Sequence, residues 1–302
     1  MPRVSVNGVS LYYEVAGHGS PLVLAHGFAC GLRMWDPQVK ALARSWRVVT
    51  YDLRGHGISG APADAAAYSQ PISVADLRAL LEHLEIRRAA VGGLSMGGNI
   101  ALNFALAHPE MVTALVVADT GAGSDETADW VATAHAFADA LERDGLETFA
   151  DAALSNPLFA RYAAQGPAAE RFIRACLMTH RARGLAHTAR EVLAKRPTIY
   201  SLAPRLRDLS VPTLLIVGEQ DEPCVKVHRF IADTIPGARH VVIPGVGHLT
   251  NLEAPDAFNR AVSTFLREAA RRATRATTRR PRSGAARPGR RRQSGSRRST
   301  TS

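Results

Sequence analysis

The segment Gly93-Leu94-Ser95-Met96-Gly97-Gly98 decides the fold. It directly follows the apolar run Ala89–Gly92 and opens a helical pattern. Glycines two residues before and two residues after a serine let a chain turn sharply from strand into helix, and the helix N-terminus favours negative charge at the serine oxygen. A serine hydroxyl becomes a nucleophile when such a turn exposes it and a base serves it. The pattern therefore predicts that Ser95 is a catalytic nucleophile rather than part of a structural glycine-rich turn.

Short, continuous apolar runs on both sides of this segment are typical of parallel strands buried on both faces. They are Leu22–Ala25, Val48–Tyr51, Ala89–Gly92, Leu115–Ala118, Leu214–Val217 and Val241–Ile243, and helical patterns lie between most of them, at Pro37–Arg44, Ser73–Glu85, Gly97–Ala107, Val225–Thr234 and Pro255–Ala269. Before them, the β-prone runs Val4–Val6 and Ser10–Val15 flank Asn7-Gly8, a dipeptide that favours a tight hairpin. The alternation predicts an α/β fold with a mostly parallel, doubly wound sheet and an antiparallel N-terminal hairpin.

The alternation is interrupted once, between Gly121 and Asp208, where the patterns are helical. An insertion of this length between two strands predicts a helical cap over the carboxyl ends of the strands, where ligands bind in open α/β sheets. The patterns cover residues 127–143, 145–154, 168–178 and 188–195. We therefore expect a core of residues 1–123 and 208–270, a cap of residues 124–207 and an Arg-rich tail of residues 271–302, which has too few large apolar residues to fold.

The charge of the chain is concentrated at its C-terminal end. The formal net charge is +10 over 302 residues, but thirteen arginines and a single acid lie between Arg267 and Ser302. The rest is nearly neutral, which argues against nucleic-acid binding by the body of the protein. The tail is predicted to be either dispensable or a weak, nonspecific contact for nucleic acid or an acidic partner, and it lacks the aromatic residues that stack on bases.

Composition and the N-terminus set the class of protein. A hydrophobic content of 46% excludes disordered and collagen-like chains. Three scattered cysteines fit a reducing compartment and give no disulfide framework. The first residues lack the apolar core of a signal peptide, and no apolar run approaches the roughly 20 residues that span a bilayer. A cytoplasmic protein with no membrane contact is expected.

The base that activates Ser95 must come from a later loop. His248 follows the last apolar run within Pro244-Gly245-Val246-Gly247-His248, a flexible stretch that can reach across the strand ends, and it is the predicted general base. His180 and His187, in the cap, are expected to line a pocket or lie on the surface. Two carboxylates follow strands and are candidates to orient His248, namely Asp221 and Asp119. The prediction favours Asp221, because successive strands then supply serine, aspartate and histidine in chain order.

The tripeptide His26-Gly27-Phe28 follows the strand Leu22–Ala25 and predicts an oxyanion hole. The backbone N–H groups of Phe28 and Met96 would be its donors, and each such donor contributes about 3–4 kcal/mol to transition-state stabilisation. Asp52 is expected to fix its own loop through Arg54 and backbone donors. Cys30 and Cys224 are expected to be small buried fillers.

Taken together, these motifs resemble the α/β-hydrolase fold superfamily over about residues 3–268. The resemblance rests on the His26-Gly27-Phe28 loop, Asp52-Leu53-Arg54-Gly55-His56-Gly57, the Ser95 turn, the cap, Asp221, and Gly247-His248 followed by Asn251-Leu252-Glu253-Ala254-Pro255. The serine segment together with Met34-Trp35-Asp36-Pro37 is similar to 3-oxoadipate enol-lactonases and small carboxylesterases. The tail has no counterpart in that family.

This resemblance implies acyl chemistry. Relatives that open epoxides or displace halide carry an aspartate at the position of Ser95, so those reactions are not expected. The implied activity is hydrolysis of small carboxylic esters or lactones, apolar or aryl, without metal or organic cofactor. Hydrolysis of a carbon–carbon bond in dienoate-type compounds and a catalytically weak ligand receptor are the alternatives. Four cap arginines could bind a substrate carboxylate or simply form a solvated face: Arg171, Arg174, Arg181 and Arg183.

Overall fold

Every predicted strand is present in one sheet of the computed structural model, which describes residues 2–278. The strands are β1 (Arg3–Val6), β2 (Val9–Ala16), β3 (Ser20–Ala25), β4 (Trp46–Tyr51), β5 (Ala89–Leu94), β6 (Val112–Ala118), β7 (Thr213–Gly218) and β8 (Arg239–Ile243). Their order across the sheet is β1-β2-β4-β3-β5-β6-β7-β8. Strand β2 runs antiparallel to β1 and β4, and all later pairs are parallel. The predicted fold class is confirmed.

The strand order reverses beside β3, and this reversal positions the site. Strand β3 pairs with β4 on one side and with β5 on the other. Ala25 is in register with both Tyr51 and Gly93, so the three strands end at the same level. Loops that leave neighbouring strands at such a switch point diverge, and ligands bind in the crevice between them. The loops that follow β3 and β5 are those of His26 and Ser95.

Helices cover the sheet and connect its strands. The longer ones are α1 (Asp36–Leu42), α2 (Gln70–His83), α3 (Met96–Ala107), α10 (Glu222–Thr234) and α12 (Pro255–Thr278), and two short ones are α9 (Ala203–Arg207) and α11 (Thr250–Glu253). Helix α2 begins three residues before the predicted start, because the Ser69 hydroxyl caps it by accepting the N–H of Ile72 at 3.2 Å. Short 3₁₀ turns occupy Leu32–Trp35, Ala65–Ala67, Pro109–Met111 and Tyr200–Leu202.

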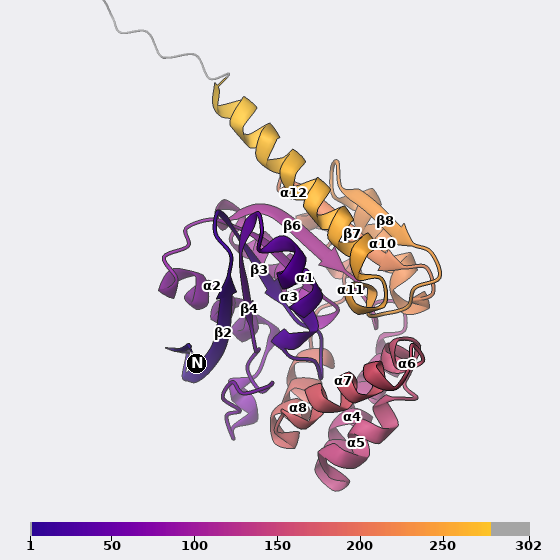
Figure 1. The fold of residues 1–302 in the computed structure, drawn as a ribbon. Helices are drawn as coiled ribbons and strands as arrows, with labels where there is room; N and C mark the ends of the chain where they lie inside the picture. The colour runs from indigo at the N-terminus through magenta and orange to yellow at the C-terminus, as the bar shows by residue number, and fades with distance from the viewer. Residues whose placement is uncertain (1, 279–302) are drawn as a thin grey trace, which may run out of the picture.

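The segment between β6 and β7 forms the helical cap. It contains α4 (Thr127–Arg143), α5 (Gly145–Ala153), α6 (Pro157–Ala163), α7 (Pro167–Met178), α8 (Ala182–Thr188) and a π-helical turn, Ala189–Leu193. These helices gather at one end of the sheet (Figure 1). The predicted patterns miss all of α8 except Thr188, and all of α6. It is short, and it begins at an Asn156 cap followed by proline.

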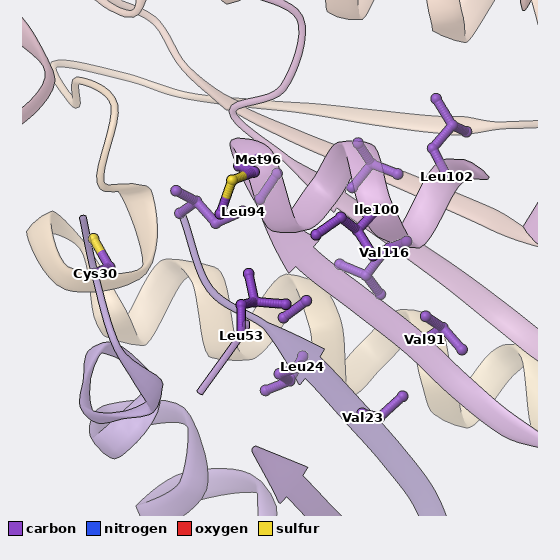
Figure 2. Packing of buried hydrophobic residues seen from close by; sticks show 14 of the residues in the cluster. Val23, Leu24, Cys30, Leu53, Val91, Leu94, Met96, Ile100, Leu102 and Val116 are labelled. Atoms are coloured by element: carbon purple, nitrogen blue, oxygen red, sulfur yellow. The ribbon is translucent and has the colours of Figure 1, made fainter. Parts of the chain in front are cut away.

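The buried core joins the sheet to the helices around it. Figure 2 shows Val91 and Leu94 of β5, Ile100 of α3 and Val116 of β6 packed in one cluster. Such close packing fixes the strand ends on which a site is built.

The C-terminal helix extends beyond the predicted core boundary. Helix α12 projects away from the sheet and reaches Thr278, so the prediction of an unfolded tail from residue 271 is wrong for residues 271–278 (Figure 1). Arg and Ala are strong helix formers, and they continue the helix where little packs against it. The rest of the predicted tail, residues 279–302, lies outside the described residues. In the described part of the chain, no helix has both the length and the hydrophobicity needed to cross a bilayer.

Candidate active site

Ser95 occupies a strained turn between β5 and α3. Its backbone angles, φ 57° and ψ −116°, are rare for a residue other than glycine. The flanking glycines have no room for side chains: a Cβ on Gly93 would lie 2.3 Å from the Gly97 carbonyl, and one on Gly97 would lie 2.1 Å from the Ala25 carbonyl oxygen. The Ser95 N–H donates to the Ala118 carbonyl at 2.8 Å. The turn leaves the Ser95 side chain partly exposed, at the wall of a cavity.

His248 lines the same cavity and is held from behind by Asp221. The distance from His248 Nδ1 to Asp221 Oδ2 is 2.8 Å, and both side chains are buried. With Nδ1–H donating to the carboxylate, the neutral ring keeps Nε2 free to accept a proton. Among residues 2–278 the structure gives no direct hydrogen bond between the Ser95 hydroxyl and His248, although the two residues share one cavity wall.

His248 and Asp221 each favour the charged form of the other. Burial lowers the pKa of His248, but the charge and hydrogen bond of Asp221, with smaller contributions from Asp119 and Glu253, outweigh burial and raise it above its ordinary value. Burial raises the pKa of Asp221, and the neighbouring His248 outweighs this and holds it below its ordinary value. Asp221 is therefore ionised at neutral pH, and it favours a positive charge on His248.

Asp119, the other predicted candidate, has different partners. Its carboxylate accepts the Gly218 N–H at 2.9 Å and the Thr250 hydroxyl. Burial, together with the charge of Asp221, raises the pKa of Asp119 well above its ordinary value. The structure therefore brings Asp221, and not Asp119, to the ring of His248.

Glu253 is a site residue whose role the sequence did not reveal, although it belongs to a quoted motif. Its carboxylate accepts the Gly247 N–H at 2.8 Å and the Leu249 N–H at 3.0 Å, so it grips the backbone on both sides of His248. The Glu253 side chain is only 5% exposed. It fixes the flexible loop predicted to reach across the strand ends.

The loop after β3 lies against the Ser95 turn. A Cβ on Gly27 would be 3.5 Å from the Cβ of Ser95, so the chain passes close to the serine. The N–H of Phe28 donates to no backbone carbonyl among residues 2–278, and Met96 is the first residue of α3, where an N–H has no acceptor in its own helix. Within residues 2–278, neither predicted donor has a backbone acceptor, and both belong to segments that lie beside Ser95.

His26 anchors that loop. Its Nε2 accepts the Leu53 N–H at 2.9 Å, so Nδ1 carries the proton that it shares with the Gly27 carbonyl at 2.7 Å. Burial lowers the pKa of His26 to about 3, so the ring is neutral. His26 therefore holds the backbone of the loop after β3 in place through Leu53 and Gly27.

His180 links the cap to these core loops. Its Nδ1 accepts the Gly57 N–H at 2.6 Å, and its Nε2 lies 3.2 Å from the carbonyl oxygen of Ala29. Burial lowers the pKa of His180 to about 3. His187, the second cap histidine considered above, is partly exposed, and its Nε2 lies 3.1 Å from the Ala63 carbonyl oxygen. Neither residue lines the cavity beside Ser95.

The expected role of Asp52 needs one correction. Asp52 does accept backbone N–H groups, from Leu32 at 2.9 Å and from Ile58 at 3.0 Å. Arg54, however, pairs with the buried carboxylate of Asp76 at 2.8 Å instead of Asp52. Asp52 therefore holds the backbone at Leu32 and Ile58, whereas Arg54 links its own loop to Asp76 of helix α2.

The cavity wall beyond the serine is largely apolar and comes from the cap. The cap contributes Trp130, Phe137, Leu158, Phe159 and Leu193, and strand β5 of the core adds Leu94. A second cavity of about 120 Å³ shares Phe28, Phe137, Leu158 and Phe159 with the first and is continued by Phe149 and the small residues of α5. The cap aromatics are therefore both helix core and cavity wall.

The cap arginines singled out in the sequence do not reach this cavity. Arg171, Arg181 and Arg183 are exposed, and Arg174 pairs with Asp151. A different arginine, Arg196, lines the wall together with Ser95 and His248. It lies in a polar turn after the last cap helix, and no motif marked it.

Two of the three cysteines lie at the site. Cys30 is buried and lines the cavity, and burial raises its pKa. Cys224 is fully buried beside Asp221, and the possible ligand atoms of Asp221, Cys224 and His248 lie within 4.8 Å of one another. This is the one cluster with metal-ligand chemistry in the described part of the chain, and its imidazole Nδ1 is already committed to Asp221.

Comparison with known proteins extends these observations. A family model described as alpha/beta hydrolase fold matches residues 20–255. The chain is 31% identical to the putative 2-succinyl-6-hydroxy-2,4-cyclohexadiene-1-carboxylate synthase of Bacillus subtilis over 84% of this chain and 94% of that protein. It is 29% identical to 3-oxoadipate enol-lactonase 2 of Acinetobacter baylyi over 87% of this chain and 96% of the relative. The solved enol-lactonase of Burkholderia xenovorans superposes with a TM-score of 0.78 at 32% identity, covering 88% of this chain and 99% of the other.

Proposed function

The chain belongs to the alpha/beta hydrolase fold family, and from that premise we propose that it is a serine hydrolase of small carboxylic esters or lactones. Ser95 is the nucleophile, His248 the general base and acid, and Asp221 the residue that orients His248. The observation that carries the proposal is the buried contact of 2.8 Å between His248 and Asp221 on the cavity wall that also holds Ser95. The enol-lactonase relatives support this class of substrate.

The reaction follows from the protonation states. Neutral His248 takes the proton of the Ser95 hydroxyl as the oxygen attacks the substrate carbonyl, and the resulting oxyanion accepts hydrogen bonds from the N–H groups of Phe28 and Met96. His248 then returns the proton to the departing alcohol, which leaves an acyl group on Ser95. Water attacks that ester with His248 again as base, and the acid is released. The charge of Asp221 stabilises the imidazolium in both halves of the reaction.

The side chains of the cap that line the cavity set the expected substrate preference. The apolar wall of Trp130, Phe137 and Phe159 favours compounds with apolar or aryl groups of modest size. Apolar burial adds about 25 cal/mol for each Å² removed from water, so the fit of the substrate to this wall contributes directly to affinity.

The test is a paired assay on the purified protein and its Ser95→Ala variant. A fluorophosphonate probe is expected to label Ser95, mapped by mass spectrometry, and the protein is expected to hydrolyse short-chain aryl esters. Ser95→Ala should lose labelling and lower turnover by at least about 10⁴-fold, because the variant has no nucleophile. Circular dichroism of the variant checks that the fold is retained.

Two outcomes separate this proposal from the alternatives. An unlabelled Ser95 in a folded, inactive protein supports a ligand receptor. Labelling of Ser95 without hydrolysis of any ester or lactone, together with cleavage of a dienoate-type ketone, supports carbon–carbon bond hydrolysis.

A further inference from the structure

His180 ties the cap to the loop that carries Phe28, one of the two predicted oxyanion donors. It lies between helices α7 and α8, and its side chain is buried. Burial lowers the pKa of His180 to about 3, so the ring is neutral at neutral pH. Because Nδ1 accepts the Gly57 N–H at 2.6 Å, the ring proton is on Nε2, and this N–H donates to the Ala29 carbonyl at 3.2 Å. A residue of the cap thus holds the chain one residue beyond Phe28.

Two planar peptide units connect that contact to the Phe28 N–H. The Ala29 carbonyl and the Cys30 N–H belong to one unit, and this N–H donates to the Gly27 carbonyl at 3.2 Å. The Gly27 carbonyl and the Phe28 N–H belong to the other unit, so the direction of one sets the direction of the other. The Nδ1–H of His26 donates to the same Gly27 carbonyl at 2.7 Å. Holding the Ala29 carbonyl therefore helps to hold the direction of the Phe28 N–H.

The loop needs such a restraint because its backbone is strained at Ala29. The φ of Ala29 is 57°, in the left-handed region that residues other than glycine rarely adopt. A return to an ordinary φ would turn the Ala29 carbonyl away from His180 and the Cys30 N–H away from Gly27. Strained backbone persists where its surroundings hold it in place. The hydrogen bond from His180 favours the strained conformation and so opposes this relaxation.

Aromatic contacts fix the ring of His180 and the side chain of Phe28 together. The His180 ring lies 5.4 Å from that of His56, between ring centres. His56 in turn lies 5.1 Å from the ring of His26 and 5.9 Å from that of Phe28. The Phe28 ring also stacks on Phe137 of α4 at 6.0 Å. The cap therefore holds this loop through its backbone and through its side chains.

We propose that His180 is a positioning residue for the oxyanion hole, because its hydrogen bond to Ala29 keeps the Phe28 N–H directed at the substrate oxygen. This inference rests on the proposed function and gives the cap a part in transition-state stabilisation as well as in substrate selection. Negative charge develops on the carbonyl oxygen as Ser95 attacks, so a misdirected N–H weakens the transition state more than the bound ester. The expected effect is therefore on kcat and not on KM.

The test compares two ketones, one of which places an oxyanion in the hole. The Ser95 oxygen adds to the carbonyl carbon of trifluoroacetophenone, the serine proton passes to His248, and the ketone oxygen becomes the oxyanion of a tetrahedral hemiketal. Acetophenone binds without this addition. The ratio of Ki for acetophenone to Ki for trifluoroacetophenone measures oxyanion stabilisation, and it does not depend on the fraction of protein that is folded. It is measured with kcat and KM for an aryl ester in each variant.

Three substitutions separate the hydrogen bond from the packing of the ring. His180→Phe keeps an aromatic ring beside His56 and removes both hydrogen bonds, and His180→Met fills the space with a flexible side chain. His180→Gln keeps one donor and one acceptor. The matched control is His187→Phe, which makes the first substitution at a cap histidine of α8. His187 contacts the Ala63 carbonyl and the Tyr68 ring, which belong to a different core loop.

The expected result is a parallel loss of turnover and of oxyanion affinity. His180→Phe and His180→Met should lower kcat by about 10- to 100-fold, because a whole oxyanion donor is worth about 10²- to 10³-fold and a misdirected one loses part of this. KM should stay within about threefold of wild type. The Ki ratio should fall by the same factor as kcat, His180→Gln should restore part of both, and His187→Phe should leave both unchanged.

Two results overturn the inference. One is a Ki ratio and a kcat that stay within about twofold of wild type in both His180→Phe and His180→Met. The other is a lower melting temperature with an unchanged Ki ratio, because His180 then joins the cap to the core without acting on the oxyanion hole.

Failure of the proposed function gives a different result. In that case the wild type hydrolyses no ester above the rate of Ser95→Ala, Ser95 is not labelled, and trifluoroacetophenone binds no more tightly than acetophenone. Hydrolysis that depends on Ser95 but is indifferent to His180 rejects only the role of His180.

Discussion

The loops after β6 and β7 make a natural comparison, because each carries a buried aspartate at the end of a parallel strand. Asp119 follows β6 and Asp221 follows β7, and the two strands are neighbours in the sheet. Asp221 meets an imidazole, at 2.8 Å, whereas Asp119 meets a hydroxyl and a backbone N–H. The same residue type at adjacent strand ends therefore has two different partners.

The different partners of Asp221 and Asp119 shift the pKa values of these two buried carboxyl groups in opposite directions. His248 can carry a positive charge, so it holds the pKa of Asp221 low. Burial and the charge of Asp221 push the pKa of Asp119 in the opposite direction. Two carboxyl groups whose pKa values are pushed apart can serve different purposes, one as a charge and one as a hydrogen-bonding group. We assign the catalytic charge to Asp221 and the support of the loops to Asp119.

The largest effect is expected from Asp221→Asn, which removes the charge beside His248. The amide has no charge to stabilise the imidazolium, and it can hold the ring in the wrong tautomer. A loss in kcat on the order of 10³- to 10⁴-fold is expected, by analogy with the same change in other triads. Steady-state hydrolysis of an aryl ester measures it.

Asp119→Asn is the matched control for that variant, because it makes the same substitution at the neighbouring strand end. Its kcat is expected to stay within about tenfold of wild type. If Asp119→Asn is the more damaging of the two while both proteins remain folded, the orienting role belongs to Asp119.

Glu253→Gln tests a third carboxylate, which acts on the loop of His248 instead of on its ring. The amide keeps one acceptor and turns a donor toward an N–H group, so one of the contacts with Gly247 and Leu249 is lost. A fall in kcat of about tenfold is expected as the loop loosens. A merely structural role would lower the melting temperature without moving the pH profile, whereas loss of the Glu253 charge should shift the acid limb of kcat/KM to lower pH.

The loops of the candidate site gave a clearer signal in the sequence than the short helices of the cap, for a physical reason. Buried parallel strands must be continuous apolar runs, and a sharp strand-to-helix turn must have glycine where a Cβ would clash. Both requirements appear directly in the residues around Ser95. In the cap, the longer helices α4, α5 and α7 begin and end within one residue of the predicted patterns, whereas the seven-residue helices α6 and α8 are too short to give a clear pattern.

The partners of individual side chains could not be predicted because they depend on the register of strands. Chain order favoured Asp221 over Asp119, but the groups that each carboxylate contacts follow from the paths of the loops that carry Thr250 and His248. Arg196 gives no local signal at all, since an arginine in a polar turn is usually solvated. Its place on the cavity wall follows from the packing of Trp130 and the loop of Ala122.

The smallest expected effect is a shift of the acid limb of the kcat/KM profile in Asp119→Asn. It tests how much of the charge that faces His248 comes from Asp119. Activity requires neutral His248, so it falls as the pH drops through the pKa of that residue, which its acidic neighbours raise above the ordinary value. Asp119 contributes less than Asp221 to this upward shift. Asp119→Asn should therefore move the acid limb to lower pH by only a few tenths of a unit, since one unit corresponds to about 1.4 kcal/mol of interaction. Profiles of kcat/KM between pH 5 and 9 measure the shift, and a displacement as large as that in Asp221→Asn would mean that the two carboxylates share the charge facing His248.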